Sequence, residues 1–565
     1  MIRMMFCSAL ALTTAGCASN GAMDAGGETY DLVIVGGTIY DGTGGDPFIG
    51  DVAVKDGLIM SVGPDATGLE IIDAAGFAVA PGFINTHSWA SQSILHDPRA
   101  MSDLKQGVTT LVMGEGWSMG PLTPAMREEM KESQGDIKFD IPWTTLGEYL
   151  QHVEDRGSAM NVASFVGTAS VRMHVLGEDD IDPTSAELTE MQSLVMAAMD
   201  EGALGIGSAL IYAPGNYAET PELVALAEAA GRCGGKHISH LRSEASRIDE
   251  ALAEFLEISR ESGAGGIVYH LKQAGRSNWD KQAGVLAATE AARAEGLDIT
   301  ATMYNYPASS TGLEAAMPLW VQKGGREAWF GRLQDPEVRA RVVAEMQSPT
   351  AMSENRLREA GGGDGVMLID FKNPDLRHLV GRTLGDVARE RGQSAAETAV
   401  DLVIEDRSRV GVVYFLMSEE NVARQVSLPW VSFGSDAGAP ATEPPFTNNG
   451  THPRAYGNIA RLLGKYVRDE KRLPLAHAIR QLTSFSAEQM NLTGIGSLAP
   501  GMAADIVVFD PATVADTATF ADPHSYAVGV RDVVVAGEAT LRNGEPTGAV
   551  PGRFLKGPGT GRCLD

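Results

Sequence analysis

The chain has 565 residues, of which 44% are hydrophobic and 21% charged, so it can bury a large core and has the composition of a globular protein. It carries 45 basic and 73 acidic residues, a formal net charge of −28. This excess of negative charge argues against a nucleic-acid ligand and against electrostatic binding to anionic lipid, both of which need a basic surface.

The first residues resemble a bacterial export signal. A basic start precedes an apolar run, Met4–Thr14, and small residues then lead to Cys17. The run is about ten residues long and too short to span a bilayer, so we expect residues 1–16 to be a signal peptide that is removed. Small residues before a cysteine resemble a lipoprotein cleavage box, although Thr14 stands where leucine is usual. We therefore expect a periplasmic protein tethered to the membrane, with a lipid on Cys17 and a tether over residues 17–29; an ordinary secretory signal is the alternative.

The sequence has few cysteines that could form disulfide bonds. Of the four cysteines, Cys7 leaves with the signal and Cys17 is the expected lipidation site. Cys233 and Cys563 remain, and two cysteines make no disulfide framework. We therefore expect stability to come from the hydrophobic core.

Both ends of the mature chain read as short strands separated by glycine and aspartate turns. The pattern covers residues 30–80 and returns over residues 491–552. Neither piece is long enough to make a good core alone, so we expect both to meet in one small β-sandwich domain. Residues 553–565 form a tail.

Short apolar strands alternate with amphipathic helices over residues 81–490, a pattern typical of a parallel α/β fold. We count eight candidate strands, at residues 83–87, 108–115, 162–168, 204–211, 236–240, 266–270, 298–304 and 430–436. Eight units favour a (β/α)8 TIM-like barrel over an open sheet. The segment at about 312–411 is too long for one connection, so we expect an inserted helical cap beside the active-site mouth.

Metal-capable side chains end five of the eight candidate strands, where the active site of such a barrel lies. They are His87, Glu115, His240, His270 and Asp436. Each residue alone is more often structural, but their joint placement at strand ends is less expected by chance. His237 and His240 are an odd number of residues apart and so point to opposite faces of one strand, and His240, at the strand end, is the better candidate.

Several long and idiosyncratic runs accompany these positions: APGFINTH, QGVTTLVMGEGWS, GIGSALIYAPGNYAET, HISHLRSEA, HLKQAGRSNW, YNYPASST, FGSD and HPRAYG. Through them the chain resembles the N-acyl-D-amino-acid deacylases (D-aminoacylases) of the metal-dependent amidohydrolase superfamily, over nearly the whole mature chain. The resemblance implies the barrel fold and the zinc-dependent hydrolysis of an N-acyl-D-amino acid to a carboxylate and a free D-amino acid.

The resemblance also implies a role for each matching position. His240 and His270 match two histidines that hold zinc, and Asp436 matches the aspartate that handles the proton of the attacking water. His87 matches the first histidine of a His-x-His pair. The positions that grip the substrate carboxylate are matched by Lys272, Tyr304, Ser310 and Arg454. Neutral imidazoles with a carboxylate suit Zn²⁺, and lysine and arginine suit a free carboxylate.

One departure from the family concerns the ligand of the tightly bound metal. The family has a cysteine in a Gly-Asn-Cys-Gly-Phe-Ser run, whereas this chain reads Gly-Glu-Gly-Trp-Ser at residues 114–118. Alignment on the serine places Glu115 on the cysteine, and a carboxylate can ligate Zn²⁺ as a thiolate does. We expect one zinc ion on Glu115, His240 and His270. Alternatively, Glu115 only accepts a hydrogen bond from a ligand histidine, or Gly116 faces the cysteine position.

The second departure is Trp89, which stands where the second histidine of the pair is usual. An indole N–H is only a donor and cannot ligate a metal, so a second metal loses a ligand and its presence stays open. His87 is then a weak ligand, a hydrogen-bond donor to substrate or a structural residue. Trp89 itself could bind substrate as an apolar or stacking wall for the acyl group.

Two other functions stay open from the sequence. The scaffold could host another amidohydrolase activity, a D-amino-acid-containing dipeptidase, a lactamase or a cyclic imide hydrolase, because one fold supports many reactions. A non-catalytic, membrane-tethered binding protein is the alternative from a different class, motivated by the loss at Trp89. The carboxylate-gripping residues favour an acyl-amino acid or a small peptide, and Asp436 favours an enzyme.

Overall fold

The structure is a computed structural model that describes residues 29–63, 66–352 and 354–564. The expected signal peptide, the lipidation site Cys17 and residues 17–28 of the expected tether lie outside these residues. Within the described ranges, no helix combines the length and the apolar character needed to cross a bilayer.

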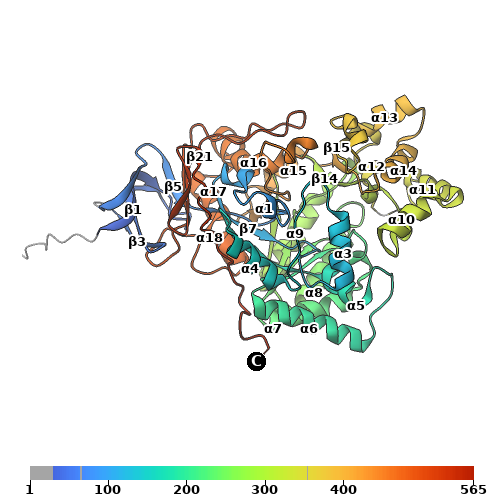
Figure 1. Ribbon diagram of the computed structural model, residues 1–565, viewed down its shortest axis with the longest axis horizontal. Helices are drawn as coiled ribbons and strands as arrows, with labels where there is room; N and C mark the ends of the chain where they lie inside the picture. The colour runs from blue at the N-terminus through green and yellow to red at the C-terminus, as the bar shows by residue number, and fades with distance from the viewer. Residues whose placement is uncertain (1–28, 64–65, 353, 565) are drawn as a thin grey trace, which may run out of the picture.

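Strands from both ends of the chain form one nine-stranded sheet, which lies at one end of the molecule (Figure 1). Its order is β21-β20-β19-β18-β5-β1-β2-β3, with β4 paired to β1. The strands are β1 (Tyr30–Ile39), β2 (Phe48–Lys55), β3 (Leu58–Gly63), β4 (Gly68–Asp73), β5 (Ala78–Pro81), β18 (Ile506–Phe509), β19 (Val530–Val535), β20 (Glu538–Arg542) and β21 (Glu545–Pro546). β5 and β18 join the two segments through antiparallel pairing, for example of Ala80 with Val507. Buried residues of both segments, among them Ile34 and Val508, share one apolar core, so the two ends meet as predicted.

The central strands are parallel and wholly buried. They form a three-stranded sheet, β6-β7-β8, and a six-stranded sheet, β17-β13-β12-β11-β10-β9. Their bounds are β6 (Phe83–Asn85), β7 (Val108–Met113), β8 (Asn161–Ser164), β9 (Val166–Gly167), β10 (Gly205–Ala209), β11 (Lys236–His240), β12 (Gly266–Val268), β13 (Ile299–Met303) and β17 (Val431–Phe433). All eight candidate strands are therefore present, the third as the consecutive β8 and β9.

The two central sheets are hydrogen-bonded to each other at both of their ends. β8 runs into β9 with one residue between them, and the Leu204 amide of the segment before β10 donates to the Ser164 carbonyl at 3.0 Å. At the other end the Thr86 amide donates to the Phe433 carbonyl at 3.3 Å, and Ser88 forms a parallel bridge with Ala437. These contacts bring the carboxyl ends of β6 and β17 side by side.

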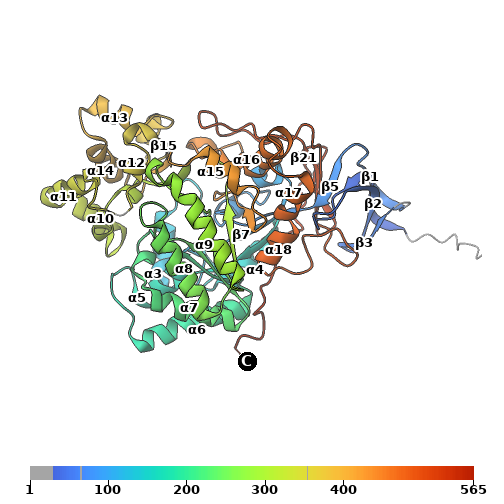
Figure 2. The same ribbon diagram turned by 180° about the vertical axis from the view of Figure 1, so that it is seen from behind.

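Helices lie between the strands in sequence and pack around the central sheets (Figures 1 and 2). The major ones are α4 (Leu146–Arg156), α5 (Thr168–Leu176), α6 (Ser185–Glu201), α7 (Thr220–Arg232), α8 (Ile248–Ser262), α9 (Gln282–Ala294), α15 (Glu419–Gln425), α16 (Arg454–Arg461), α17 (Leu475–Leu482) and α18 (Ser484–Gln489). Helix α8 illustrates why these segments are helical. It has acidic residues in its first turn, ends at Gly263 in the left-handed region, and buries Leu252, Phe255 and Ile258 at helical spacing.

The expected insertion projects from one side of the molecule, and it is not only helical (Figure 1). Its helices are α10 (Gly325–Gln334), α11 (Pro336–Gln347), α12 (Arg356–Glu359), α13 (Leu384–Arg391) and α14 (Ala395–Asp406). An antiparallel sheet, β14-β16-β15, accompanies them, with β14 (Ser309–Gly312), β15 (Val366–Asp370) and β16 (Gly411–Tyr414). β14 and β16 pair with each other where the insertion leaves and rejoins the central fold, so they close its base.

Cys233 and Cys563 form a disulfide with their Cα atoms 5.3 Å apart. The bond ties the residue that follows α7 to the C-terminal tail, whose Leu555 amide donates to the Val162 carbonyl of β8 at 2.9 Å. The expectation that the core alone supplies stability is therefore corrected. Because the two cysteines are 330 positions apart in the sequence, nothing in the local sequence indicates that they pair.

Candidate active site

The five side chains predicted at strand ends converge on one buried site. His87 follows β6, Glu115 follows β7, His240 ends β11, His270 follows β12 and Asp436 follows β17. Four of them are almost wholly buried, and the Asp436 side chain is 11% exposed. Their approach follows from the parallel strands, because the carboxyl ends of neighbouring strands meet at one face of the fold.

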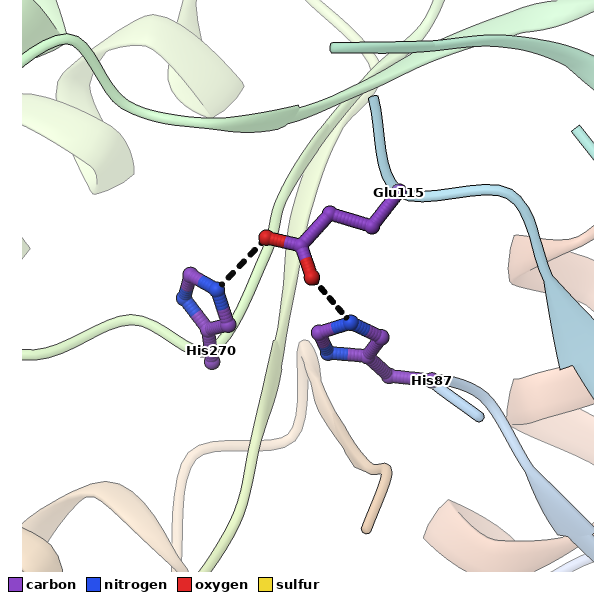
Figure 3. A group of neighbouring side chains, drawn as sticks. All are labelled: His87, Glu115 and His270. Atoms are coloured by element: carbon purple, nitrogen blue, oxygen red, sulfur yellow. Dashed lines mark hydrogen bonds and ion pairs between the residues drawn. The ribbon is translucent and has the colours of Figure 1, made fainter. Parts of the chain in front are cut away.

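Glu115 lies between two imidazoles and contacts both of them (Figure 3). Its Oε2 is 2.7 Å from His87 Nε2, and its Oε1 is 3.0 Å from His270 Nε2. Burial raises the pKa of Glu115, but the two histidines outweigh it and hold this pKa well below its usual range. Burial lowers the pKa of His270, but the flanking carboxylates of Glu115 and Glu244 outweigh it and raise this pKa to about 9. The buried carboxylates of Glu115 and Glu244 therefore favour a positive charge at the His270 ring between them.

His240 lies against the other side of the His270 ring, with the two ring centroids 4.5 Å apart. Burial lowers the pKa of His240 to about 4, so its imidazole is neutral at neutral pH. Its Nδ1 lies 2.9 Å from the Leu241 carbonyl, an arrangement that places the ring hydrogen on Nδ1 and leaves the Nε2 lone pair free. The described residues thus contain two candidate ligand sets that share His270: one with His87 and Glu115, the other with His240 and Glu244.

Glu244 is a site residue that the sequence reasoning missed. Its buried carboxylate lies 3.1 Å from His270 Nδ1, accepts a hydrogen bond from Lys272 Nζ, and accepts another at 2.7 Å from Arg356 of α12 in the insertion. Burial raises the pKa of Glu244, but His240 and Lys272 outweigh it and hold it well below its usual range. A signal was available, since Glu244 follows His240 by four residues in the run HISHLRSEA.

Two of the converging residues have strained backbones. His270 has a φ of 34° and Asp436 a φ of 48°, in the left-handed region that residues other than glycine rarely adopt. The His270 amide donates to Thr302 Oγ1 at 2.9 Å, and the Asp436 amide donates to the His87 carbonyl at 2.8 Å. Such strain persists where the surroundings hold it and is common at functional sites.

Trp89 directs its indole N–H toward the carboxylates of Glu115 and Asp436. Nε1 donates to Asp436 Oδ1 at 3.0 Å and to Glu115 Oε2 at 3.2 Å, while 40% of the residue remains exposed. The N–H therefore connects two acidic side chains from different strands. The role of Trp89 as a wall for the acyl group stays a prediction.

Arg454 and Tyr304, two of the predicted carboxylate-gripping residues, lie together beside Asp436. Arg454 Nη1 is ion-paired with Asp436 Oδ2 at 2.9 Å, and its guanidinium lies 4.4 Å from the centre of the Tyr304 ring. The buried Tyr304 hydroxyl and Arg454 Nε find no hydrogen-bond partner within the part of the chain that the structure describes. Leaving buried donors unsatisfied costs about 1–3 kcal/mol each, so they favour an added acceptor.

The other two predicted grip residues adjoin this pair and have partners of their own. Ser310 accepts a hydrogen bond from Arg454 through its carbonyl at 3.3 Å, and its hydroxyl donates to the Val412 carbonyl at 3.0 Å. Lys272 lies 5.5 Å from the centre of the Tyr304 ring, but its ammonium donates to Glu244 and lies 2.8 Å from His270 Nδ1. Lys272 and Arg454 therefore lie beside Tyr304, and Ser310 contacts Arg454. The role of these four residues in binding substrate stays a prediction.

The donor set fits a zinc ion. Two imidazoles with one carboxylate are a common ligand set of catalytic zinc, which keeps one coordination position open. His87, Glu115 and His270 supply that set, with ligand atoms within 4.8 Å of one another and all three residues buried. His240 adds a neutral imidazole beside His270. The structure thus brings Glu115 and His270 together as predicted, and it places His87 in direct contact with Glu115 where His240 was expected.

A buried group of imidazoles and carboxylates at the carboxyl ends of parallel strands has the chemistry of a catalytic metal site. The model of the amidohydrolase family matches residues 70–540. The chain therefore belongs to the amidohydrolase family, whose members hydrolyse carbon–nitrogen bonds. Within this family it is one of the D-aminoacylase-like members.

Three similar proteins show how far the likeness extends. D-aminoacylase of Alcaligenes xylosoxydans xylosoxydans is 32% identical over 94% of this chain and 98% of its own length. The structure of N-acyl-D-glutamate deacylase from Bordetella bronchiseptica, complexed with zinc and a phosphonate mimic of the tetrahedral intermediate, has a TM-score of 0.78 and 30% identity, over 94% of this chain and 100% of that one. A D-aminoacylase described with a binuclear metal centre, one-metal activation and second-metal attenuation has a TM-score of 0.77 and 31% identity, over 93% and 100%.

Proposed function

We propose that the protein hydrolyses the amide bond of N-acyl-D-amino acids and that it needs zinc to do so. One observation carries this proposal: the buried Tyr304 hydroxyl and Arg454 guanidinium present unsatisfied donors beside Asp436, next to the imidazole and carboxylate cluster. An acyl-amino acid offers a carboxylate for those donors and an amide for the cluster. The relatives named as deacylases of D-amino acids support the same substrate class.

The proposed zinc ligands are Glu115, His240 and His270, with His87 as a further candidate ligand. Glu115, His270 and His87 form the buried set described above, and His240 lies beside the His270 ring. Zinc held there would polarise the amide carbonyl and lower the pKa of bound water to about 7. The zinc in the related N-acyl-D-glutamate deacylase supports this choice of metal.

Asp436 is the proposed proton carrier. It takes one proton from the attacking water as the oxygen bonds to the amide carbon, and it returns that proton to the nitrogen as the carbon–nitrogen bond breaks. Arg454 orients Asp436 Oδ2 through the ion pair, and the Trp89 N–H orients Asp436 Oδ1. The products are a carboxylate and a free D-amino acid.

The geometry of carboxylate binding sets the handedness of the substrate. Arg454 can hold a carboxylate through two parallel N–H groups, and Tyr304 and Ser310 can add a third contact. With the carboxylate and the amide both fixed, the two enantiomers direct their side chains to different places, so the site can accept one and reject the other.

The fold and the cellular location that we propose follow the sequence predictions. The hydrogen bonds that join the two central sheets at both ends support a closed (β/α)8 barrel. The Cys233–Cys563 disulfide supports export, because disulfides persist in oxidising compartments. A periplasmic protein tethered through a lipid on Cys17 remains our proposal for its location.

A chiral assay tests the function. N-acetyl-D-methionine, N-acetyl-L-methionine and a D-amino-acid-containing dipeptide are offered to the zinc-loaded protein and to Asp436→Ala. We expect turnover of the D-acyl substrate alone, lost in the variant while folding and zinc content persist. Preference for the dipeptide would identify another amidohydrolase activity, and no turnover in either form would favour the binding protein.

A further inference from the structure

We infer that the Trp89 indole takes the place of a second metal ion, so that the site holds one zinc and the N–H group fixes the carboxylates of Glu115 and Asp436. The inference rests on the proposed zinc site and concerns its stoichiometry and the positioning of Asp436.

Three potential ligand atoms of a second ion lie close together. His87 Nε2 is 2.7 Å from Glu115 Oε2 and 3.5 Å from Asp436 Oδ1. Trp89 Nε1 donates to the same two oxygens, at 3.2 and 3.0 Å. An indole nitrogen has a hydrogen and no free lone pair, so it supplies positive polarity to both carboxylates but cannot bind a cation.

The backbone holds the indole in this place. The Trp89 amide donates to the Ala437 carbonyl at 2.9 Å, and the preceding Ser88 pairs with Ala437 in a parallel bridge. The Asp436 amide donates in turn to the His87 carbonyl at 2.8 Å. Residues 87–89 and 436–437 thus form a short ladder, and the indole N–H extends it from backbone to side chains.

A histidine at residue 89 would lose the fused six-membered ring of the indole but keep a ring nitrogen at about the same place. In both side chains the nitrogen lies in a five-membered ring, two bonds from Cγ, so an imidazole Nε2 reaches nearly the same position as the indole Nε1. A neutral imidazole can present a lone pair there and ligate a metal. Trp89→His is therefore expected to create a second metal site.

The comparison with a relative gives this substitution a consequence for regulation. A D-aminoacylase with a binuclear centre is described as activated by one metal and attenuated by the second. If the indole excludes the second ion, excess zinc does not attenuate this protein through that site.

Zinc content tests the inference directly. Zinc is measured by elemental analysis after equilibration of the wild type, Trp89→His and Trp89→Phe with the same excess of free zinc. Trp117→Phe is the matched control, because Trp117 lies in the neighbouring loop and is 37% exposed, close to the 40% of Trp89. We expect one zinc per chain in the wild type and the control, and two in Trp89→His.

Two zinc ions in the wild type, or one in a folded Trp89→His, would overturn the inference and leave the proposed function standing. No zinc in the wild type would instead overturn the proposed zinc site. Should Trp89→His fail to fold, the wild type still decides, since two zinc ions per wild-type chain in excess zinc contradict the inference.

Kinetics of Trp89→Phe distinguish positioning from acyl binding. Phenylalanine keeps an aromatic face and loses the N–H, so loss of positioning lowers kcat by about 10-fold to 100-fold with little change in KM. A variant with unchanged kcat would show that the N–H does not position Asp436, and a raised KM alone would assign Trp89 to the acyl group.

Discussion

Replacing Glu244 with glutamine removes one charge from a buried cluster while it keeps the shape of the side chain. Glu244 and its two cationic partners, Lys272 and Arg356, are each only 3–4% exposed. Leaving one partner of a buried ion pair without its counter-charge costs about 3–5 kcal/mol. We expect Glu244→Gln to lose about that much free energy of unfolding.

The structure predicts which of the two cations, Arg356 or Lys272, is left without a counter-charge when Glu244 is replaced. Arg356 keeps Glu359 at 2.9 Å and Glu354 at 3.5 Å, so it remains paired without Glu244. Lys272 keeps only its contact with His270 Nδ1, among the polar contacts that the described residues make with its ammonium. The second substitution, Lys272→Met, removes the stranded charge, and the double variant should regain about 2 kcal/mol or more.

Urea unfolding measures these differences. The experiment is run in excess chelator so that zinc affinity does not enter the free energy, and slopes of the transitions are compared to confirm equal exposure of surface. Glu228→Gln is the control, because Glu228 and Arg232 form an exposed pair whose loss costs less than about 1 kcal/mol. A double variant no more stable than Glu244→Gln would refute the stranded-charge explanation, and a single variant as stable as the control would refute the whole estimate.

Three further predictions concern the metal, the substrate and the crosslink. Glu115→Ala should lose most of its zinc, and unchanged zinc by elemental analysis would show that Glu115 is not a ligand. Arg454→Lys should raise KM for an N-acyl-D-amino acid about tenfold or more with zinc retained, because lysine cannot make the two-pronged contact; a KM equal to that of the wild type would place the carboxylate elsewhere. Cys233→Ser should lower stability toward urea by about 2–4 kcal/mol, and reduction of the wild type should have the same effect; no change on reduction would mean that the bond does not form in solution.

Much of the fold was predictable because apolar runs are local signals. The eight candidate strands were recognisable from short apolar segments, and KHISH coincides with β11. The pairing of the two ends was predictable because neither end can make a core alone. β14, β15 and β16 were missed, since strands of four or five residues within a long helical insertion show too little alternation to detect.

The site was predictable where metal-capable residues follow strands and not where distant segments meet. His87, Glu115 and His270 converge because parallel strands place their carboxyl ends together. Arg356 reaches Glu244 from a helix 112 residues later in the chain, and no local pattern indicates this contact. The position of His87 beside Glu115 also depends on tertiary packing, which decides which of several histidines touches a given carboxylate.

Titration of the metal-depleted protein with zinc tests the central claim most directly, with N-acetyl-D-methionine and its L enantiomer as parallel substrates. We predict that D-specific hydrolysis rises from near zero to a plateau at one equivalent of zinc, with the L enantiomer left intact. Hydrolysis without zinc, or bound zinc with neither enantiomer cleaved, would contradict the account.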